Sequence, residues 1–210
     1  MQTSTEHTAQ QALYYVYDPM CSWCYAFRPV WQQVQQQLPL SIQVQTVLGG
    51  LAPDTDEPMP STTKNMIQAN WHKIMQVVSG TEFNFSFWTK CQPRRSTYPA
   101  CRAVLAAESQ QAQAGQTMLT AIQNAYYQQA RNPSDTSTLI ALATEIGLQA
   151  ERFAIDLKSV SIQEQFEHNL ALADQLGVNS FPSLVLKTDN RPRRIEHSYT
   201  NAAAILQQMI

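Results

Sequence analysis

Hydrophobic and polar positions divide the chain into a strand–helix–strand segment, a long helical stretch and a short β-rich segment. Residues 12–17 form a continuous run of strand-forming residues and predict a buried strand. Apolar side chains at helical spacing over residues 27–38 predict an amphipathic helix with glutamines on its outer face. Alternating positions over residues 41–48 predict a second strand. A helix between two strands implies that the strands are parallel and form a βαβ unit.

The helical period then dominates from residue 61 to residue 176. Residues 81–96 interrupt it with an aromatic segment of no clear period. Helix signals on either side of this segment predict several helices, with glycines as their C-terminal stops. The predicted starts are a cap at Ser61, a first-turn proline at Pro99, a cap at Asp135 and a capping box of Ser161 and Glu164. The predicted stops are Gly80, Gly147 and Gly177.

The period changes again after the last of these helices. Residues 183–187 predict a third strand, and the polar residues 188–192 predict a turn. Residues 194–199 predict a weaker fourth strand, and Asn201 is placed to cap a final helix. The whole chain therefore predicts a βαβ unit, a helical insertion of about 120 residues and a ββα unit.

Composition excludes several classes of protein. The 210 residues are 44% hydrophobic and 14% charged, and the net charge is −2. An average chain is about 25% charged, and glutamine, with 26 residues, supplies much of the polarity here. This balance excludes a disordered chain and disfavours a nucleic-acid partner. No apolar run has the ~18 residues that span a membrane, and residues 1–11 predict a loose tail without a signal peptide, so we expect a cytoplasmic protein.

Two cysteines, Cys21 and Cys24, lie where the first strand passes into the first helix. Amide groups at a helix start favour the thiolate form of Cys21. Cys24 lies one turn further on, in reach of a disulfide formed at Cys21. In a reducing compartment such a pair is typical of redox chemistry, although half a zinc site or an inert buried pair would fit the spacing. Cys91 and Cys101 form no second motif of this kind, so no metal site is predicted.

A proline, Pro182, precedes the third strand in the segment Ser180-Phe181-Pro182. Proline is unusual at the entry to a strand unless the strand is an edge or the turn is special. The preceding peptide bond is then a candidate for the cis form, and an ordinary loop proline is the alternative.

These motifs together resemble the thioredoxin superfamily. Cys21-Ser22-Trp23-Cys24 is similar to its active-site motif, Pro29 to the proline inside its first helix and Ser180-Phe181-Pro182 to its cis-proline loop. The helical insertion resembles the DsbA branch, and residues 12–210 are similar to cytosolic DsbA-family proteins described as protein-disulfide isomerases. The resemblance implies an α/β thioredoxin fold, formed by residues 12–60 and 177–210, with residues 61–176 as an all-helical, DsbA-like insertion domain.

The resemblance also implies a thiol–disulfide oxidoreductase without a cofactor. Cys21 would be the nucleophile and Cys24 the resolving thiol, with Trp23, Phe181 and Pro182 at the substrate surface. The partners would be protein or small-molecule thiols and disulfides, among them glutathione. No membrane partner is expected. Because the chain shows no export signal and has no room for a dimerisation domain, a cytosolic reductase or isomerase fits better than a disulfide-forming oxidase.

Several alternatives stay open at this level. Asp18 is either a turn-former before Pro19 or a buried carboxylate that takes a proton when Cys24 attacks. Cys101 is either a reactive thiol beside basic residues or a packed helix cysteine. The basic residues themselves, Arg94, Arg95 and Arg102, are either an anion site, for glutathione among others, or a solvated face.

Two other functions also remain open. The chain is similar to glutathione-dependent isomerases of the 2-hydroxychromene-2-carboxylate type, which share the insertion but typically lack the second cysteine. A binding module in which the cysteines act as a redox switch is the non-enzymatic alternative.

Overall fold

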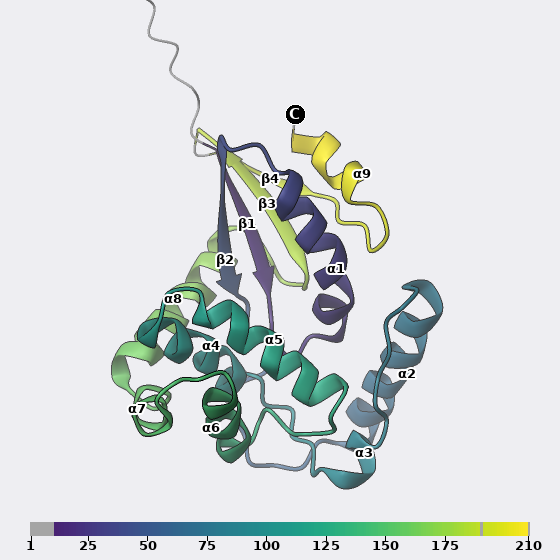
Figure 1. The fold of residues 1–210 in the computed structure, drawn as a ribbon. Helices are drawn as coiled ribbons and strands as arrows, with labels where there is room; N and C mark the ends of the chain where they lie inside the picture. The colour runs from purple at the N-terminus through teal and green to yellow at the C-terminus, as the bar shows by residue number, and fades with distance from the viewer. Residues whose placement is uncertain (1–10, 190, 210) are drawn as a thin grey trace, which may run out of the picture.

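A four-stranded sheet forms the centre of the computed structural model, which describes residues 11–189 and 191–209. The strand order is β2-β1-β3-β4 (Figure 1). β1 and β2 are parallel, as predicted, whereas β3 runs antiparallel to β1 and β4 antiparallel to β3. The strands are β1 (Gln11–Tyr17), β2 (Ile42–Leu48), β3 (Ser183–Thr188) and β4 (Arg191–Ile195).

Both faces of the sheet are covered by helices. Helix α1 (Ser22–Gln37) connects β1 to β2 and packs beside α9 (Ala202–Leu206) on one face. Helix α8 (Val160–Gln175) packs against the other face, over β2. Alternate side chains of a strand point to opposite faces. Because each set of β1 side chains meets a helix, β1 is buried on both faces, which explains its continuous apolar sequence.

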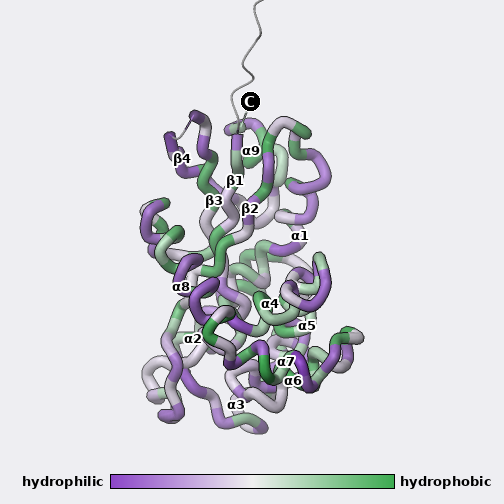
Figure 2. The backbone as a smooth tube through the Cα atoms, turned by 90° about the vertical axis from the view of Figure 1, so that its left-hand side faces the viewer, coloured by the Kyte–Doolittle hydropathy of each residue, from purple (hydrophilic) through white to green (hydrophobic). Residues whose placement is uncertain are grey.

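The insertion adds a second layer of helices beyond the carboxyl end of β1 (Figure 1). A cluster of aromatic rings around the fully buried Trp71 forms its core, with Phe83, Trp88 and Tyr127 in contact with the indole. Figure 2 shows hydrophobic residues gathered around α4 and α5, while β4 at the sheet edge is hydrophilic. The helices are α2 (Ser61–Val77), α3 (Phe87–Lys90), α4 (Tyr98–Gln110), α5 (Ala114–Tyr127), α6 (Thr136–Glu145) and α7 (Ala150–Asp156).

Several predicted helix ends are confirmed. Asn201 caps α9, since its Oδ1 accepts a hydrogen bond from the amide of Ala204. Pro99 lies in the first turn of α4. Pro29 lies inside α1, which continues through it. The predicted glycine stops have positive φ angles, the left-handed conformation that glycine adopts most easily: Gly80, Gly147 and Gly177.

Two predicted caps are wrong, and a third, at Asp135, is confirmed in its position but not in its hydrogen bond. Ser159 caps α8, two residues before the predicted capping box at Ser161, because its Oγ accepts from the Ile162 amide. Pro60 is the N-cap of α2, so Ser61 is already helical. Asp135 stands at the N-cap of α6 but makes no capping hydrogen bond, since its carboxylate binds Arg94 instead.

The fourth strand begins three residues earlier in the chain than the predicted range 194–199. β4 begins at Arg191, paired with Thr188, because the hairpin turn is tighter than the polar run 188–192 suggested. The basic residues of β4 protect this exposed sheet edge from pairing with another chain. The short helices α3 and α7 were not predicted, because segments of four and seven residues are too brief to show a period. The predicted N-terminal tail lies outside the described residues except for Gln11, which belongs to β1.

The division of the chain into a sheet domain and an insertion at residues 61–176 stays a proposal. Helix α8, at the end of this range, packs on both α4 and β2. It therefore links the insertion to the sheet. None of the helices in the described ranges has the length and apolar character to cross a membrane.

Candidate active site

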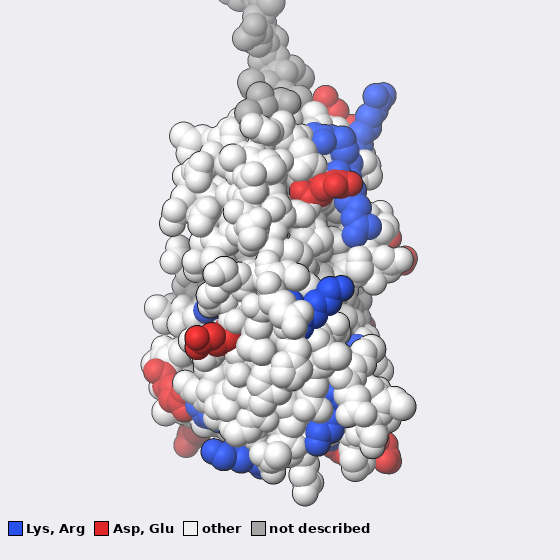
Figure 3. Space-filling model, turned by 90° about the vertical axis from the view of Figure 1, so that its right-hand side faces the viewer, with Lys and Arg blue, Asp and Glu red and all other residues white. Residues whose placement is uncertain are grey.

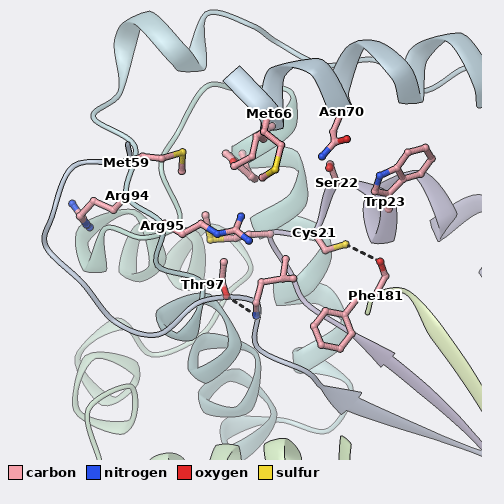
Figure 4. Close-up of a pocket in the computed structure, with 14 residues that line it drawn as sticks. Cys21, Ser22, Trp23, Met59, Met66, Asn70, Arg94, Arg95, Thr97 and Phe181 are labelled. Atoms are coloured by element: carbon pink, nitrogen blue, oxygen red, sulfur yellow. Dashed lines mark hydrogen bonds between the residues drawn. The ribbon is translucent and has the colours of Figure 1, made fainter. Parts of the chain in front are cut away.

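The two cysteines of the motif lie at the start of α1, beside the loop that precedes β3. Cys21 is the N-cap of α1, and its sulfur accepts a hydrogen bond from the Cys24 amide at 3.3 Å. The Cys21 thiol also lies 3.5 Å from the carbonyl oxygen of Phe181, to which it donates (Figure 4). An amide that points at the sulfur stabilises a thiolate. The arrangement therefore provides one sulfur near the surface with a partner three residues further along the helix.

Cys24 is the more deeply placed of the two. Only 1% of its surface is exposed, compared with 6% for Cys21. Burial, followed by the hydrogen bond and charge of Cys21, raises the pKa of the Cys24 thiol well above its usual range. Cys24 therefore lies behind Cys21, and its role as the resolving thiol stays a prediction.

Asp18 is fully buried and binds three separate segments of the chain. Its Oδ1 accepts from the Met20 amide at 2.7 Å, which is consistent with the turn-forming alternative that the sequence offered. Its Oδ2 accepts from the Leu51 amide at 2.7 Å, the Thr97 hydroxyl at 2.6 Å and the Cys101 thiol at 3.6 Å. Burial raises the pKa of this carboxyl, while the hydrogen bonds act in the opposite direction. The role of Asp18 as a proton acceptor for Cys24 stays a prediction.

A cavity of about 170 Å³ opens beside Cys21, between α2 and the start of α1 (Figure 4). Three methionines contribute to its walls, namely Met20, Met59 and Met66. Methionine side chains adapt to differently shaped apolar ligands. The remaining apolar lining comes from Leu51, Ile67, Tyr126, Trp23 and Phe181, and the polar lining from Ser22, Asn70, Thr97, Arg94 and Arg95.

The other predicted surface residues lie around this cavity. Trp23 packs on Tyr199, with ring centroids 5.0 Å apart. The Phe181–Pro182 peptide bond is cis, which agrees with the alternative favoured by the family resemblance. The structure thus brings Cys21, Trp23 and Phe181 together, although contact of these residues with a substrate remains a prediction.

Cys101 and Cys91 lie away from this opening. Cys101 is fully buried, and burial together with the Asp18 carboxylate raises the pKa of its thiol. This placement favours the packed-cysteine alternative over a reactive thiol. The Cys91 thiol is 3.0 Å from the Ala130 carbonyl oxygen, and both cysteines are free. Among the described residues, no group of three or more metal-ligating side chains is placed to bind a metal ion.

Two parts of the site carry no signal in the sequence. Thr97, whose hydroxyl binds Asp18, lies next to the segment without a clear period. Met59 and Met66 lie on the far wall of the cavity, in the loop before α2 and in α2 itself. No local signal in the sequence marks these residues, because only the fold of the insertion brings them to Cys21.

Comparison with known proteins agrees with this fold. The family model described as Thioredoxin matches residues 14–199. The ClpXP adapter protein SpxH of Bacillus subtilis (strain 168) is 25% identical over 173 residues, or 82% of the chain. The chain spans only 56% of the length of that relative.

Two solved structures are similar over most of their length. A candidate protein disulfide isomerase from Nitrosomonas europaea has a TM-score of 0.81 and 26% identity, with 95% of this chain and 96% of that chain covered. The cytosolic disulfide reductase DsbM from Pseudomonas aeruginosa has a TM-score of 0.72 and 26% identity, with 88% and 89% covered. DsbM has also been solved with GSH. These similarities confirm the predicted DsbA-like α/β fold with its helical insertion.

Proposed function

Because the chain belongs to the thioredoxin family, we propose that it is a thiol–disulfide oxidoreductase with Cys21 as nucleophile and Cys24 as resolving thiol. The single observation that carries this proposal is the position of Cys21. Its sulfur caps α1 and accepts the Cys24 amide at the opening of a cavity, whereas Cys24 is buried behind it. The similarity to DsbM supports the same assignment.

The proposed cycle balances two electrons and two protons. The Cys21 thiolate attacks one sulfur of a substrate disulfide, which forms a mixed disulfide and releases the other sulfur as a thiol. Cys24 then gives up its proton and attacks the Cys21 sulfur, so that the second substrate thiol leaves. The enzyme now holds a Cys21–Cys24 disulfide, and the substrate has been reduced. Two equivalents of a small thiol, such as glutathione, return the enzyme to the dithiol.

We propose reduction in the cytoplasm as the direction of this cycle. Support comes from DsbM, which is described as a cytosolic disulfide reductase and has been solved with GSH. Isomerisation of protein disulfides uses the same first step and ends when a substrate thiol, rather than Cys24, resolves the mixed disulfide. The reduction potential of the pair separates these uses, since a value near −270 mV is typical of a reductase and about −120 mV of an oxidant.

The test compares three single variants in an assay that couples reduction of a glutathionylated peptide to NADPH oxidation. Cys21→Ser is expected to lose activity, and Cys24→Ser to accumulate a mixed disulfide at Cys21 that mass spectrometry detects. Cys91→Ser, which removes a thiol outside the site, is the matched control and is expected to keep wild-type activity. A Cys21→Ser enzyme as active as the wild type would overturn the proposal.

A second candidate is a binding module in which the cysteine pair acts as a switch. The sequence similarity to SpxH, which is named as a ClpXP adapter, favours this candidate. A module of this kind would show no catalytic turnover, whereas its partner would bind with different affinities to the dithiol and disulfide forms. Turnover of the glutathionylated peptide that depends on Cys21 favours the enzyme.

A further inference from the structure

The three arginines that the sequence groups together have different surroundings. Arg94 makes an ion pair with Asp135 at 2.7 Å and also donates to the Ser134 carbonyl. Arg102 makes a bidentate ion pair with Asp54 on the outer surface, in which its two terminal nitrogens lie 2.7 and 2.8 Å from the two carboxylate oxygens. For Arg95, the part of the chain that the structure describes offers the guanidinium neither a hydrogen bond nor an ion pair. One of the three cations is therefore left for an external anion.

Arg95 is also the arginine that extends across the cavity beside Cys21. Figure 4 shows its guanidinium between the methionine wall and Thr97, with the Cys21 sulfur further along the same opening. Its side chain is half-buried. Figure 3 shows one face of the molecule, on which uncharged side chains cover most of the surface and basic and acidic side chains gather at the upper right. Arg94 also lines the cavity, but its guanidinium is paired with Asp135, so Arg95 supplies the unpaired cation among the lining residues.

A half-buried cation among apolar walls favours a ligand of a particular kind. Charges interact more strongly where water is partly excluded. The planar guanidinium binds a carboxylate through two parallel hydrogen bonds, which lysine cannot reproduce. The walls formed by Met59 and Met66 suit the aliphatic part of a ligand. The site therefore combines a reactive sulfur, an apolar channel and a carboxylate-binding end.

We propose that Arg95 binds a carboxylate of the substrate and makes the site selective for small acidic thiols and disulfides, of which glutathione disulfide is the test case. This proposal rests on the proposed oxidoreductase function and adds the substrate class. Pockets for whole small molecules are typically about 300–1,000 Å³. The cavity here is about 170 Å³ and fits one arm of such a substrate. The reacting sulfur then stays at the opening, next to Cys21.

The first experiment measures binding without redox chemistry. S-methylglutathione, which cannot react with Cys21, is titrated calorimetrically into the wild type, Arg95→Gln, Arg95→Lys and Arg152→Gln. Arg95→Gln is expected to weaken binding about ten-fold or more, as for loss of a hydrogen bond to a charged group. Arg95→Lys should recover part of this loss. Arg152→Gln removes the same charge from the exposed face of α7 and should bind like the wild type.

The carboxylate is tested with the dimethyl ester of S-methylglutathione. The wild type is expected to have a lower affinity for the ester than for the acid. The affinity for the ester should be the same in Arg95→Gln as in the wild type. An equal loss for acid and ester in Arg95→Gln would indicate a structural role of Arg95 and overturn the proposal. Binding of the acid that is unchanged in Arg95→Gln would overturn it as well.

The second experiment follows a single turnover, in which one equivalent of disulfide oxidises the Cys21 and Cys24 thiols of the reduced enzyme and is itself reduced to two thiols, so no further reductant is needed. In Arg95→Gln we expect the second-order rate constant for reaction with glutathione disulfide to fall about ten-fold, while the rate constant for the uncharged bis(2-hydroxyethyl) disulfide stays constant. If the wild type reduces neither disulfide, the proposed function fails and the binding experiment still decides on Arg95. If the wild type reduces insulin but does not bind S-methylglutathione, the acidic-substrate proposal fails and the oxidoreductase stands.

Discussion

The aromatic ring of Phe181 occupies the space in which a side chain at Gly49 would lie. Gly49 follows β2, and its amide donates to the carbonyl of Tyr17 at the end of β1. The carbonyl oxygen of Phe181 in turn faces the Cys21 thiol. The absence of a side chain at residue 49 therefore allows the loop before β3 to approach the cysteine motif closely.

We expect Gly49→Ala to displace the Phe181 ring and to lower the free energy of unfolding by about 1–3 kcal/mol, the usual cost of overpacking. In Phe181→Ala the space is open, so adding Gly49→Ala to that variant should cost much less. Urea unfolding of the four proteins forms a double-mutant cycle. Additive effects of the two substitutions would show that the ring is not the obstacle.

Thr97 is expected to stabilise the wall of the cavity through its hydroxyl group. The hydroxyl donates to Asp18 at 2.6 Å and accepts from the amides of Leu51 and Ala52, each at 3.1 Å. Thr97→Val keeps the shape but leaves buried polar groups without a partner, which costs about 1–3 kcal/mol. Thr97→Ser keeps the hydroxyl and is the matched control. Equal unfolding midpoints for the valine and serine variants would contradict this role.

Asp18 is expected to make stability depend on pH in a defined direction. Its pKa is raised in the folded chain, so the folded state holds the proton more tightly than the unfolded state does. This contribution to the free energy of unfolding is full below the unfolded pKa of about 3.9 and is lost as pH rises through the folded pKa. Asp18→Asn removes it. The stability of the wild type relative to Asp18→Asn should therefore fall with rising pH and become constant above the folded pKa.

Urea unfolding of both proteins between about pH 3.5 and pH 8 measures this difference. Asp174→Asn, at an exposed position of α8, is the control for loss of a negative charge. If the free energy of unfolding of the wild type relative to Asp18→Asn increased with pH, the raised pKa would be contradicted. The hydrogen bonds to Asp18 would then have a larger effect on its pKa than burial has.

Cys101 is expected to be unreactive in the folded protein. Its thiol is fully buried and its pKa is raised by burial, followed by the negative charge of Asp18. Alkylation with iodoacetamide, followed by mass spectrometry, should modify Cys101 only in urea. Cys101→Ala should keep most of the proposed disulfide reductase activity. Rapid alkylation under native conditions would favour the reactive-thiol alternative for Cys101.

The amino-acid sequence by itself determined the features that depend on neighbouring residues. The parallel βαβ unit and the position of Cys21 and Cys24 at its strand–helix junction follow from periods of two and 3.6 residues and from a short motif. The cap at Asn201 and the glycine stops are equally local. The choice between Ser159 and Ser161 as the N-cap of α8 was wrong. Either serine could cap a helix, and the packing of α8 on the sheet decides where the helix starts.

Only the tertiary structure decided which distant residues surround the cysteines. Asp18 and Thr97 are 79 positions apart, and their hydrogen bond exists because the insertion packs against the end of β1. The sequence presents Arg94, Arg95 and Arg102 as one basic group, but Asp135 and Asp54 pair with two of them and leave Arg95 facing the cavity. Local pattern cannot distinguish these arginines, because the environment of each charge depends on the segments that pack around it.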